Sequence, residues 1–279
     1  MAGGGAWGRS VFRYEDARGN AISDDEALER IRSLVIPPAW KEVWISPNAR
    51  AKLQATGIDA AGRRQYLYHP AYRAAQEERK FDRLVSFGER LPTLRKQMMV
   101  KHLGLGPYEP DWACAVALSV VNRAWFRVGS ERYARQTRTY GVTTLRKRHA
   151  TVRGDRVTFR FHGKHRVLVR STIVDPALAD AVKALLKYPG GSRLIRFDRS
   201  GEPALLTGPM LNEYVGEHLG EAFTTKDFRT WGGTLTAAIA LAEHDPPDSR
   251  AGERRILAAV MRRVGEELGI PRRSHVPRT

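Results

Sequence analysis

Cysteine is nearly absent from this chain of 279 residues, which has only Cys114. A single cysteine excludes both an intrachain disulfide and a zinc site built from cysteines. Cys114 lies in an apolar stretch of helical character, where we expect a small core residue. The sequence also has no apolar run long enough to span a bilayer and no secretory leader, so we expect a cytoplasmic protein in a reducing compartment.

Acidic residues are scarce relative to basic ones, because 30 Asp and Glu face 47 Lys and Arg, giving a formal net charge of +17. Such a surplus favours a polyphosphate partner, which is nucleic acid or, less often, an anionic membrane. Residues 127–170 hold thirteen Lys and Arg against Glu131 and Asp155, with apolar residues between them. This pattern favours a folded surface that binds nucleic acid over a basic tail or a surface tuned for solubility.

Tyrosine is absent from the last part of the chain, where the final one is Tyr214. The absence matters because of three basic residues: Arg127 in the segment 126–133, Lys164 in 161–165 and Arg229 in 226–231. Together they have the character of most of an active site for phosphodiester chemistry on DNA. Such a site next needs a tyrosine downstream of Arg229, and this chain has none.

The chain is long enough for one large or two modest cores, and its patterns predict two domains of an α+β fold. We expect a flexible lead-in over 1–9, a small strand-rich domain over 10–88, a larger, mainly helical domain with a small sheet over 89–268, and a basic tail over 269–279. In the first domain a hairpin turn is expected at 16–20, a helix opened by a Ser23–Glu26 capping box, and strands at 43–45, 52–56 and 65–68.

Helical periodicity is expected to begin near Ala74, in the connection that leads from the first domain to the second. The expected helices are 74–85, 94–99, 111–127, 176–187, 209–219, 226–243 and 250–268. Residues 152–170 alternate, with Val157, Phe159 and Phe161 on one face, and Gly163 interrupts the alternation. We therefore expect a β-hairpin with Lys164 at or beside its tip.

The ordered set of segments resembles the type IB DNA topoisomerases, in the compact form shared by poxviruses and many bacteria. In the first domain the resemblance is carried by residues 36–40, 43–45, 53–57 and 64–70. In the second it is carried by Phe126–Gly129, Tyr140–Leu145, Phe161–Lys164 and Lys226–Arg229. No single segment is specific to the family, but their order and spacing are. The resemblance implies the fold of the DNA-breaking-rejoining enzymes, a first domain that clamps DNA, and a monomer that works on duplex DNA in the nucleoid.

The resemblance also implies roles for the three basic residues. A tyrosine attacks one DNA strand to form a 3′-phosphotyrosine, the helix rotates, and the step reverses. Arg127 and Arg229 would stabilise charge on the phosphate oxygens with their forks of donors. Lys164, with a pKa lowered by neighbouring cations, would give a proton to the departing 5′-oxygen. The bond energy stays in the phosphotyrosine, so neither ATP nor a metal is expected, and the sequence has no phosphate loop or carboxylate cluster spaced for Mg²⁺.

Several further residues match positions that contact DNA in the family: Gln65, Tyr66, Tyr68, Lys80, Tyr133 and Lys226. Tyr66 and Tyr68 share one face of a strand and could reach a groove together, or could be half-buried strand aromatics. Lys226 could bind the phosphate or merely balance Asp227. Three histidines of the basic hairpin region are expected on the surface or facing phosphate, not as metal ligands: His149, His162 and His165.

The resemblance fails after Gly269, where the family continues with His or Asn, then Thr-Pro and a later tyrosine. This chain has Ile270 and a basic ending instead. A reading frame of AAT ACC CCG GCG GTC GCA CGT GCC TCG TAC would encode Asn-Thr-Pro-Ala-Val-Ala-Arg-Ala-Ser-Tyr. Loss of one A turns it into codons for the observed residues 270–278 and begins Thr279. We therefore expect a frameshift at the Gly269 codon, with genuine divergence to a basic, non-catalytic tail as the alternative.

Two other functions stay open. A tyrosine recombinase shares the chemistry, but it usually carries a histidine two residues before the arginine that corresponds to Arg229, where this chain has Asp227. A non-covalent DNA-binding protein derived from the enzyme needs no tyrosine at all.

Overall fold

The computed structural model describes residues 12–270, except for the side chains of residues 97–100, and divides into two compact units, 1–81 and 82–279. The division falls inside one long helix, α2 (Pro70–Leu94), earlier than the expected boundary after residue 88. The expected lead-in over 1–9 and most of the expected tail over 269–279 lie outside the described residues.

The first unit is built on a three-stranded antiparallel sheet, β1 (Lys41–Ile45), β2 (Leu53–Ile58) and β3 (Arg64–Tyr68), in that order. All three strands were expected. The predicted turn is also present, as Glu15 and Ala21 form a bridge around it. Helix α1 (Asp25–Ser33) begins one residue later than the capping box indicated, because the carboxylate of Asp24 caps it by accepting from Ala27 N at 2.8 Å.

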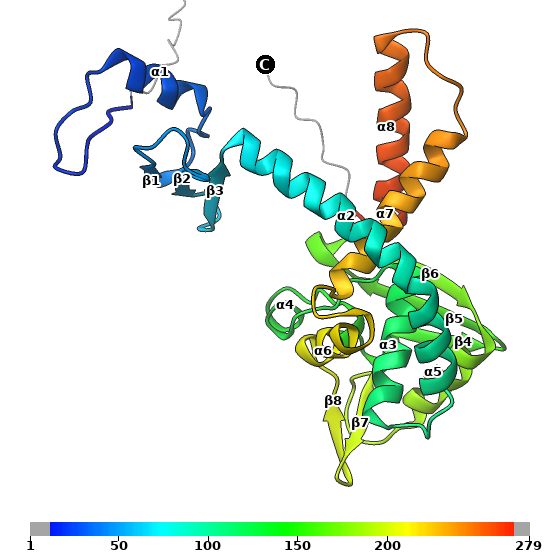
Figure 1. The fold of residues 1–279 in the computed structure, drawn as a ribbon. Coiled ribbons are helices and arrows are strands. Elements are labelled where there is room, and N and C mark those ends of the chain that lie inside the picture. The colour runs from blue at the N-terminus through cyan, green and yellow to red at the C-terminus, as the bar shows by residue number, and fades with distance from the viewer. Residues whose placement is uncertain (1–11, 271–279) are drawn as a thin grey trace, which may run out of the picture. The chain divides into compact units, whose positions relative to one another are not determined.

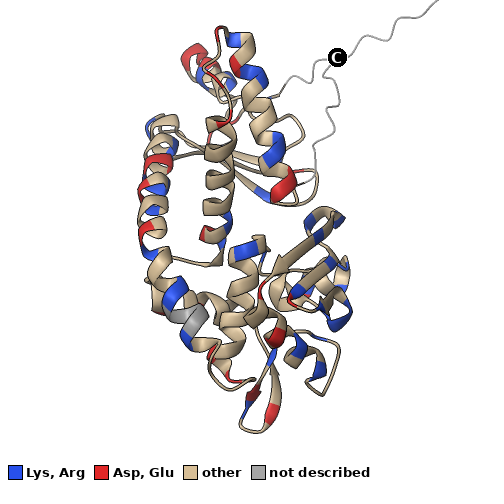
Figure 2. Ribbon diagram, turned by 90° about the vertical axis from the view of Figure 1, so that its right-hand side faces the viewer, with Lys and Arg blue, Asp and Glu red and all other residues tan. Residues whose placement is uncertain are grey.

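Helix α2 runs without a break where two separate helical stretches, 74–85 and 94–99, were expected, and continues as a π-helix, η1 (Arg95–His102). Basic and acidic residues alternate in small groups along the length of α2 (Figure 2). Its later residues, Phe87, Leu91 and Leu94, are buried in the core of the second unit.

That core is organised around α3 (Pro110–Ala124), whose residues 112–121 are all buried. A helix that is apolar on every side needs neighbours all round, and α3 contacts α5 (Pro176–Lys187), α6 (Gly208–Leu219) and α7 (Thr225–Ala242) (Figure 1). Cys114 on α3 is 4% exposed, as expected for a core residue, and burial raises the pKa of its thiol to about 12.

A second antiparallel sheet of β4 (Ala150–Arg153), β5 (Arg156–His162) and β6 (Leu168–Val174) lies against this core. Its β5 strand buries Val157, Phe159 and Phe161 and exposes the residues between them, which confirms the predicted alternation. Beyond α7, α8 (Arg250–Glu267) packs back along it as a helical hairpin (Figure 1).

Several elements of the second unit were not predicted. Among them are the short helix α4 (Glu131–Gln136), the strand β4, and the two-stranded sheet of β7 (Arg196–Arg199) and β8 (Glu202–Leu205). The α+β class is confirmed, with small antiparallel sheets and a mainly helical second unit. No helix within the described part of the chain is both long and apolar enough to cross a membrane.

Candidate active site

Arg127 is positioned by the aromatic residue that precedes it. Helix α3 ends at Ala124, three residues before the predicted end, because Trp125 takes a left-handed conformation with φ 50° and turns the chain out of the helix. Phe126 is then buried edge-on against two aromatic rings of β5, Phe159 at 5.5 Å and Phe161 at 4.9 Å between centroids. The same strand that anchors Phe126 therefore leads, three residues after Phe161, to Lys164.

The backbone at Arg127 is fixed by a second contact, with the loop 140–144. Val142 N donates to the carbonyl oxygen of Arg127, and Thr143 N donates to that of Val128, both at 2.8 Å. This approach requires glycine at position 141, where a Cβ would lie 2.4 Å from the Arg127 carbonyl oxygen. The loop is tied in turn to β5, since Tyr140 N donates to the carbonyl of His162 at 2.8 Å.

Arg229 lies in the first turns of α7, whose start is held by Asp227. The Asp227 carboxylate accepts from Thr224 N at 2.8 Å and from the Thr224 hydroxyl at 3.1 Å, a capping arrangement. It also accepts from the guanidinium of Arg83 at 2.7 Å. Asp227 is thus engaged by the helix start and by α2, and within the described residues no hydrogen bond or ion pair joins it to Lys226.

Lys164 lies at the tip of the β5–β6 hairpin, as predicted, in a short 3₁₀ turn over Lys164–Arg166. Its side chain is exposed. The next two residues, His165 and Arg166, have φ values of 61° and 59° in the left-handed region, which is unfavourable for residues other than glycine. The hairpin tip therefore reverses through a strained backbone directly after Lys164.

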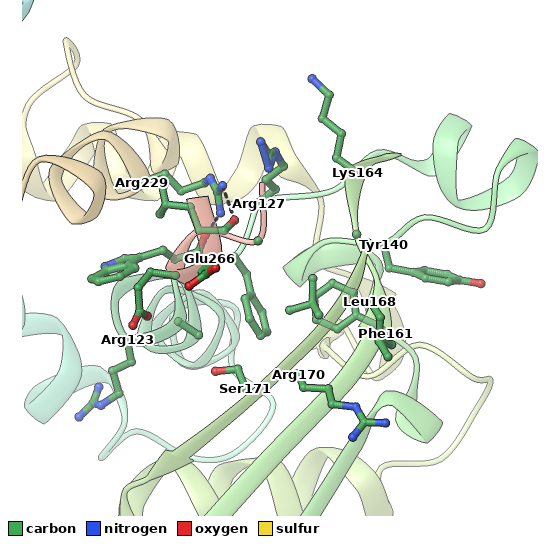
Figure 3. A pocket seen from close by; sticks show the side chains of 18 residues that line it. Arg123, Arg127, Tyr140, Phe161, Lys164, Leu168, Arg170, Ser171, Arg229 and Glu266 are labelled. Carbon is green, nitrogen blue, oxygen red and sulfur yellow. Dashed lines mark hydrogen bonds between the residues drawn. The ribbon is translucent and has the colours of Figure 1, made fainter. Parts of the chain in front are cut away.

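The three predicted catalytic residues line one pocket of about 390 Å³. Figure 3 shows the guanidiniums of Arg127 and Arg229 side by side at one wall, with Lys164 extending from the hairpin on the opposite side. Burial lowers the pKa of Arg127. Burial, and then the charge of Arg127, lowers the pKa of Arg229 to about 10. Both groups stay cationic at neutral pH, so the pocket holds two partly desolvated positive charges next to one another, an arrangement that an anion would relieve.

Arg229 is held in this place by two backbone carbonyls. One guanidinium nitrogen donates to the oxygen of Trp125, and the other donates to that of Leu268 at 2.9 Å (Figure 3). Leu268 caps the end of α8. Gly269 also lines the pocket, so the position at which the resemblance to the family fails, residue 270, directly follows the pocket wall.

Two of the other predicted site residues of the second unit lie outside this pocket. Tyr133 is on α4 with 59% of its surface exposed, and Lys226 is exposed at the start of α7. Neither lines the pocket. They are free for contacts with a large ligand, but not with a phosphate held between Arg127 and Arg229.

The remaining predicted DNA contacts belong to the first unit. Tyr66 and Tyr68 share one face of β3, with stacked rings 6.4 Å apart and exposures of 51% and 40%, so about half of each side chain is open to solvent. Gln65 is half-buried, and its amide donates to Asp59 at 2.8 Å. Lys80 is exposed on α2.

The expectation that His149 of the second unit lies on the surface or faces phosphate was wrong. His149 is 7% exposed and its ring packs against Tyr140 at 4.5 Å, so it is a core residue and not one on the surface. The residues next to His149 in the sequence did not indicate that it is buried, because its burial comes from the loop 140–145, which folds over the ring.

Several lining residues of the pocket were not singled out from the sequence. They are Arg123, Trp125, Tyr140, Arg170 and the end of α8, Glu266–Gly269. Tyr140 lies in a segment that carried the resemblance to the family, and Gly269 marks the point where the resemblance ends. These positions were the available sequence signal that both residues belong to the site. Within the described residues, no group of three or more His, Cys, Asp or Glu is arranged to hold a metal ion.

Comparisons with known proteins divide the chain in a similar way. Residues 11–59 match the family model of the bacterial DNA topoisomerase IB N-terminal domain, and residues 69–273 match that of the eukaryotic DNA topoisomerase I catalytic core. The DNA topoisomerase 1B of Acanthamoeba polyphaga mimivirus is 35% identical over 236 residues, covering 83% of this chain and 69% of the viral protein. The DNA topoisomerase 1B of Vaccinia virus (strain Copenhagen) is 27% identical over 158 residues, 53% of this chain and 48% of that protein.

Proposed function

The chain belongs to the type IB DNA topoisomerase family, and we propose that its active site is built to relax supercoiled duplex DNA through a 3′-phosphotyrosyl intermediate. The observation that carries this proposal is the pocket in which Arg127 and Arg229 lie together opposite Lys164. Within this family, an isomerase family, that arrangement has a direct chemical use.

The two arginines would bind the non-bridging oxygens of the scissile phosphate. Before DNA arrives, Phe126 anchors the backbone next to Arg127, and the carbonyls of Trp125 and Leu268 hold the guanidinium of Arg229. As a phenol oxygen attacks phosphorus, the bond to the 5′-oxygen breaks, and Lys164 would supply a proton to that oxygen. The reverse step returns the proton and restores the strand, so neither ATP nor a metal is needed.

We further propose that the 279-residue polypeptide binds DNA but does not form the covalent intermediate, because no tyrosine follows Arg229. Two tyrosines of the second unit could be considered as substitutes. Tyr140 lines the pocket, but its hydroxyl points away from the guanidiniums (Figure 3). Tyr214 is 3% exposed, and its hydroxyl is hydrogen-bonded to Nδ1 of His102 at 2.5 Å. Burial raises the pKa of its phenol. Neither is a suitable nucleophile.

Relaxation of a supercoiled plasmid without Mg²⁺ or ATP tests both parts of the proposal. We expect the 279-residue chain to shift plasmid mobility by binding and to leave its linking number unchanged. A nicked suicide duplex should give no protein–DNA adduct that survives denaturation. Robust relaxation or a denaturation-resistant adduct would refute the proposed inactivity, and failure to bind duplex DNA at low salt would refute the proposed function.

The altered end of the chain has a separate test. We propose that a one-nucleotide deletion at the Gly269 codon replaced the expected tyrosine segment, since one deletion accounts for residues 270–279. Resequencing the locus decides between this and divergence. An unbroken frame that cannot encode the tyrosine in any frame would leave divergence as the explanation.

The absence of a tyrosine after Tyr214 also favours a second function, that of a non-covalent DNA-binding protein derived from the enzyme. A variant in which residues 270–279 are replaced by Asn-Thr-Pro-Ala-Val-Ala-Arg-Ala-Ser-Tyr, the ten residues of the alternative reading frame, distinguishes a damaged enzyme from a DNA-binding protein. An adduct with the nicked duplex favours a damaged enzyme, and unchanged non-covalent binding favours the binding protein. For either function we expect a monomer in the cytoplasm, associated with the nucleoid.

A further inference from the structure

A second pocket of about 330 Å³ lies in the second unit and has no role in the chemistry described above. Four of its six lining residues are arginines: the lining consists of Ala134, Arg135, Arg138, Tyr140, Arg146 and Arg148. The four arginines come from three places along the chain, which are helix α4, the turn after it and the segment that leads to β4. Folding therefore brings them together, and they are not a simple charge run in the sequence.

The positive charge of this arginine pocket is not balanced by the protein. No ion pair with a carboxylate is found for any of its four arginines within the described residues. The nearest acidic residue in sequence, Glu131, is paired with Arg193 instead. Four like charges around one cavity repel one another, so the fold maintains an arrangement that an anion would stabilise.

The pocket also has a rigid floor. Tyr140 is 7% exposed, and the Arg146 guanidinium lies 5.7 Å from the centre of its ring. The backbone N–H of Arg146 donates to Nδ1 of the buried His149 at 3.1 Å, and the His149 ring packs edge-on against Tyr140 with 4.5 Å between the ring centroids. Arg146 is therefore held in place, while Arg135, Arg138 and Arg148 are exposed and able to close on a ligand.

Tyr140 lines both this pocket and the pocket of Arg127, Lys164 and Arg229. The two cavities are therefore neighbours that share one side chain. Guanidinium groups bind phosphate with paired donors, and a duplex that presents one phosphate at the first pocket presents others at regular spacing along the same backbone.

We propose that the arginine pocket binds a second, non-scissile phosphate of the DNA backbone, next to the one held by Arg127 and Arg229. The inference rests on the proposed function, because it takes duplex DNA as the ligand. The contact adds to affinity and to its salt dependence, and it carries no sequence information by itself. A small polyanion free in solution would be bound by the same guanidinium donors, and the experiment below distinguishes it from a phosphate of the DNA backbone.

The test compares two double variants of the full chain. R138Q/R148Q removes two exposed charges of the arginine pocket, and R254Q/R255Q removes two exposed charges of α8 that lie outside it. Binding of a short duplex is measured at several salt concentrations. We expect the slope of log K against log salt to fall by about 1 for R138Q/R148Q, the loss of one phosphate contact, and by less than half as much for R254Q/R255Q. Thermal unfolding of each variant reports whether it is folded.

Equal slopes for the two folded double variants would overturn the proposal while the wild type still binds DNA steeply. If inorganic pyrophosphate raises the melting temperature of the wild type but not of R138Q/R148Q, and the DNA slopes are equal, the pocket takes a free polyanion and the assignment to DNA is wrong. Absence of any DNA binding by the wild type would instead refute the proposed function.

Discussion

Arg229 donates a hydrogen bond to the backbone carbonyl of Trp125, and the indole of Trp125 covers the same helix one turn later, at Gly232. Trp125 ends α3 in a left-handed conformation, two residues before Arg127. The two arginines of the pocket are therefore not placed independently. A shift of Trp125 moves the partner of Arg229 and the chain that leads to Arg127 together.

Gly232→Ala is expected to disturb both arginines at once. A Cβ at this position would lie 2.4 Å from Cε2 of Trp125, so the indole has to move. We expect a loss of about 1–3 kcal/mol in the free energy of unfolding, the usual cost of overpacking, together with weaker binding of duplex DNA. Chemical denaturation and a DNA titration measure the two effects.

Gly233→Ala on the same helix is the matched control. Its Cβ would meet the end of the flexible Leu268 side chain at 3.1 Å and a methyl group of Val264 at an ordinary 3.7 Å, and alanine is the better helix former by about 1 kcal/mol. This variant should be as stable as the wild type or more so. Equal stability and equal DNA affinity of the two variants would contradict the coupling through Trp125.

Arg229→Gln is expected to remove the anion site of the pocket. Sulfate or phosphate at millimolar concentration should raise the melting temperature of the wild type, because an anion that binds only the folded state stabilises it. The variant should lose at least half of that rise. Lys226→Gln removes one positive charge as well, but Lys226 lies one turn earlier and outside the pocket lining, so this variant should keep the full rise in melting temperature. If both substitutions have the same effect, the anion is not held between Arg127 and Arg229.

Cys114 is expected to be unreactive in the folded protein. The side chain is buried in α3 and its thiol pKa is raised to about 12, chiefly by burial, so almost no thiolate is present or accessible at pH 8. Labelling with a maleimide should be slow in buffer and fast in a denaturant, with a rate that follows unfolding. Rapid labelling of the native chain would mean that the core around α3 opens readily.

The sequence was sufficient to predict those elements in which local pattern and burial agree. Strand β5 alternates because one of its faces meets the core, and α5 was predicted with its observed bounds because a proline begins it and Tyr188-Pro follows its end. The three proposed catalytic residues could be chosen because their segments keep the order of a family. The position of Lys164 at a hairpin tip followed from the interruption at Gly163.

Other features depend on contacts between segments distant in the sequence and have no local signal. The end of α3 at Ala124 is set by Trp125, whose ring meets Gly232 more than a hundred residues later. The burial of His149 likewise depends on Tyr140 and on the end of β5. The arginine pocket was visible in the sequence only as part of a basic region, because its shape comes from the packing of α4 near the 140–148 segment.

His149 provides a final prediction, through the dependence of stability on pH. Burial, and then the charges of Arg148, Arg146 and His162, lowers the pKa of His149 from 6.5 to about 4. As pH falls from about 6.5 to 4, the unfolded chain takes up a proton at this residue while the folded chain does not, so the contribution to stability that is complete above pH 6.5 is lost. The loss should be on the order of 2–3 kcal/mol. His149→Asn can still accept from Arg146 N but does not titrate, so unfolding curves at pH 7 and pH 4.5 should differ less for this variant than for the wild type. An equal fall in stability for the two proteins would show that His149 is protonated in the folded state, and that the field of the arginine pocket does not reach it.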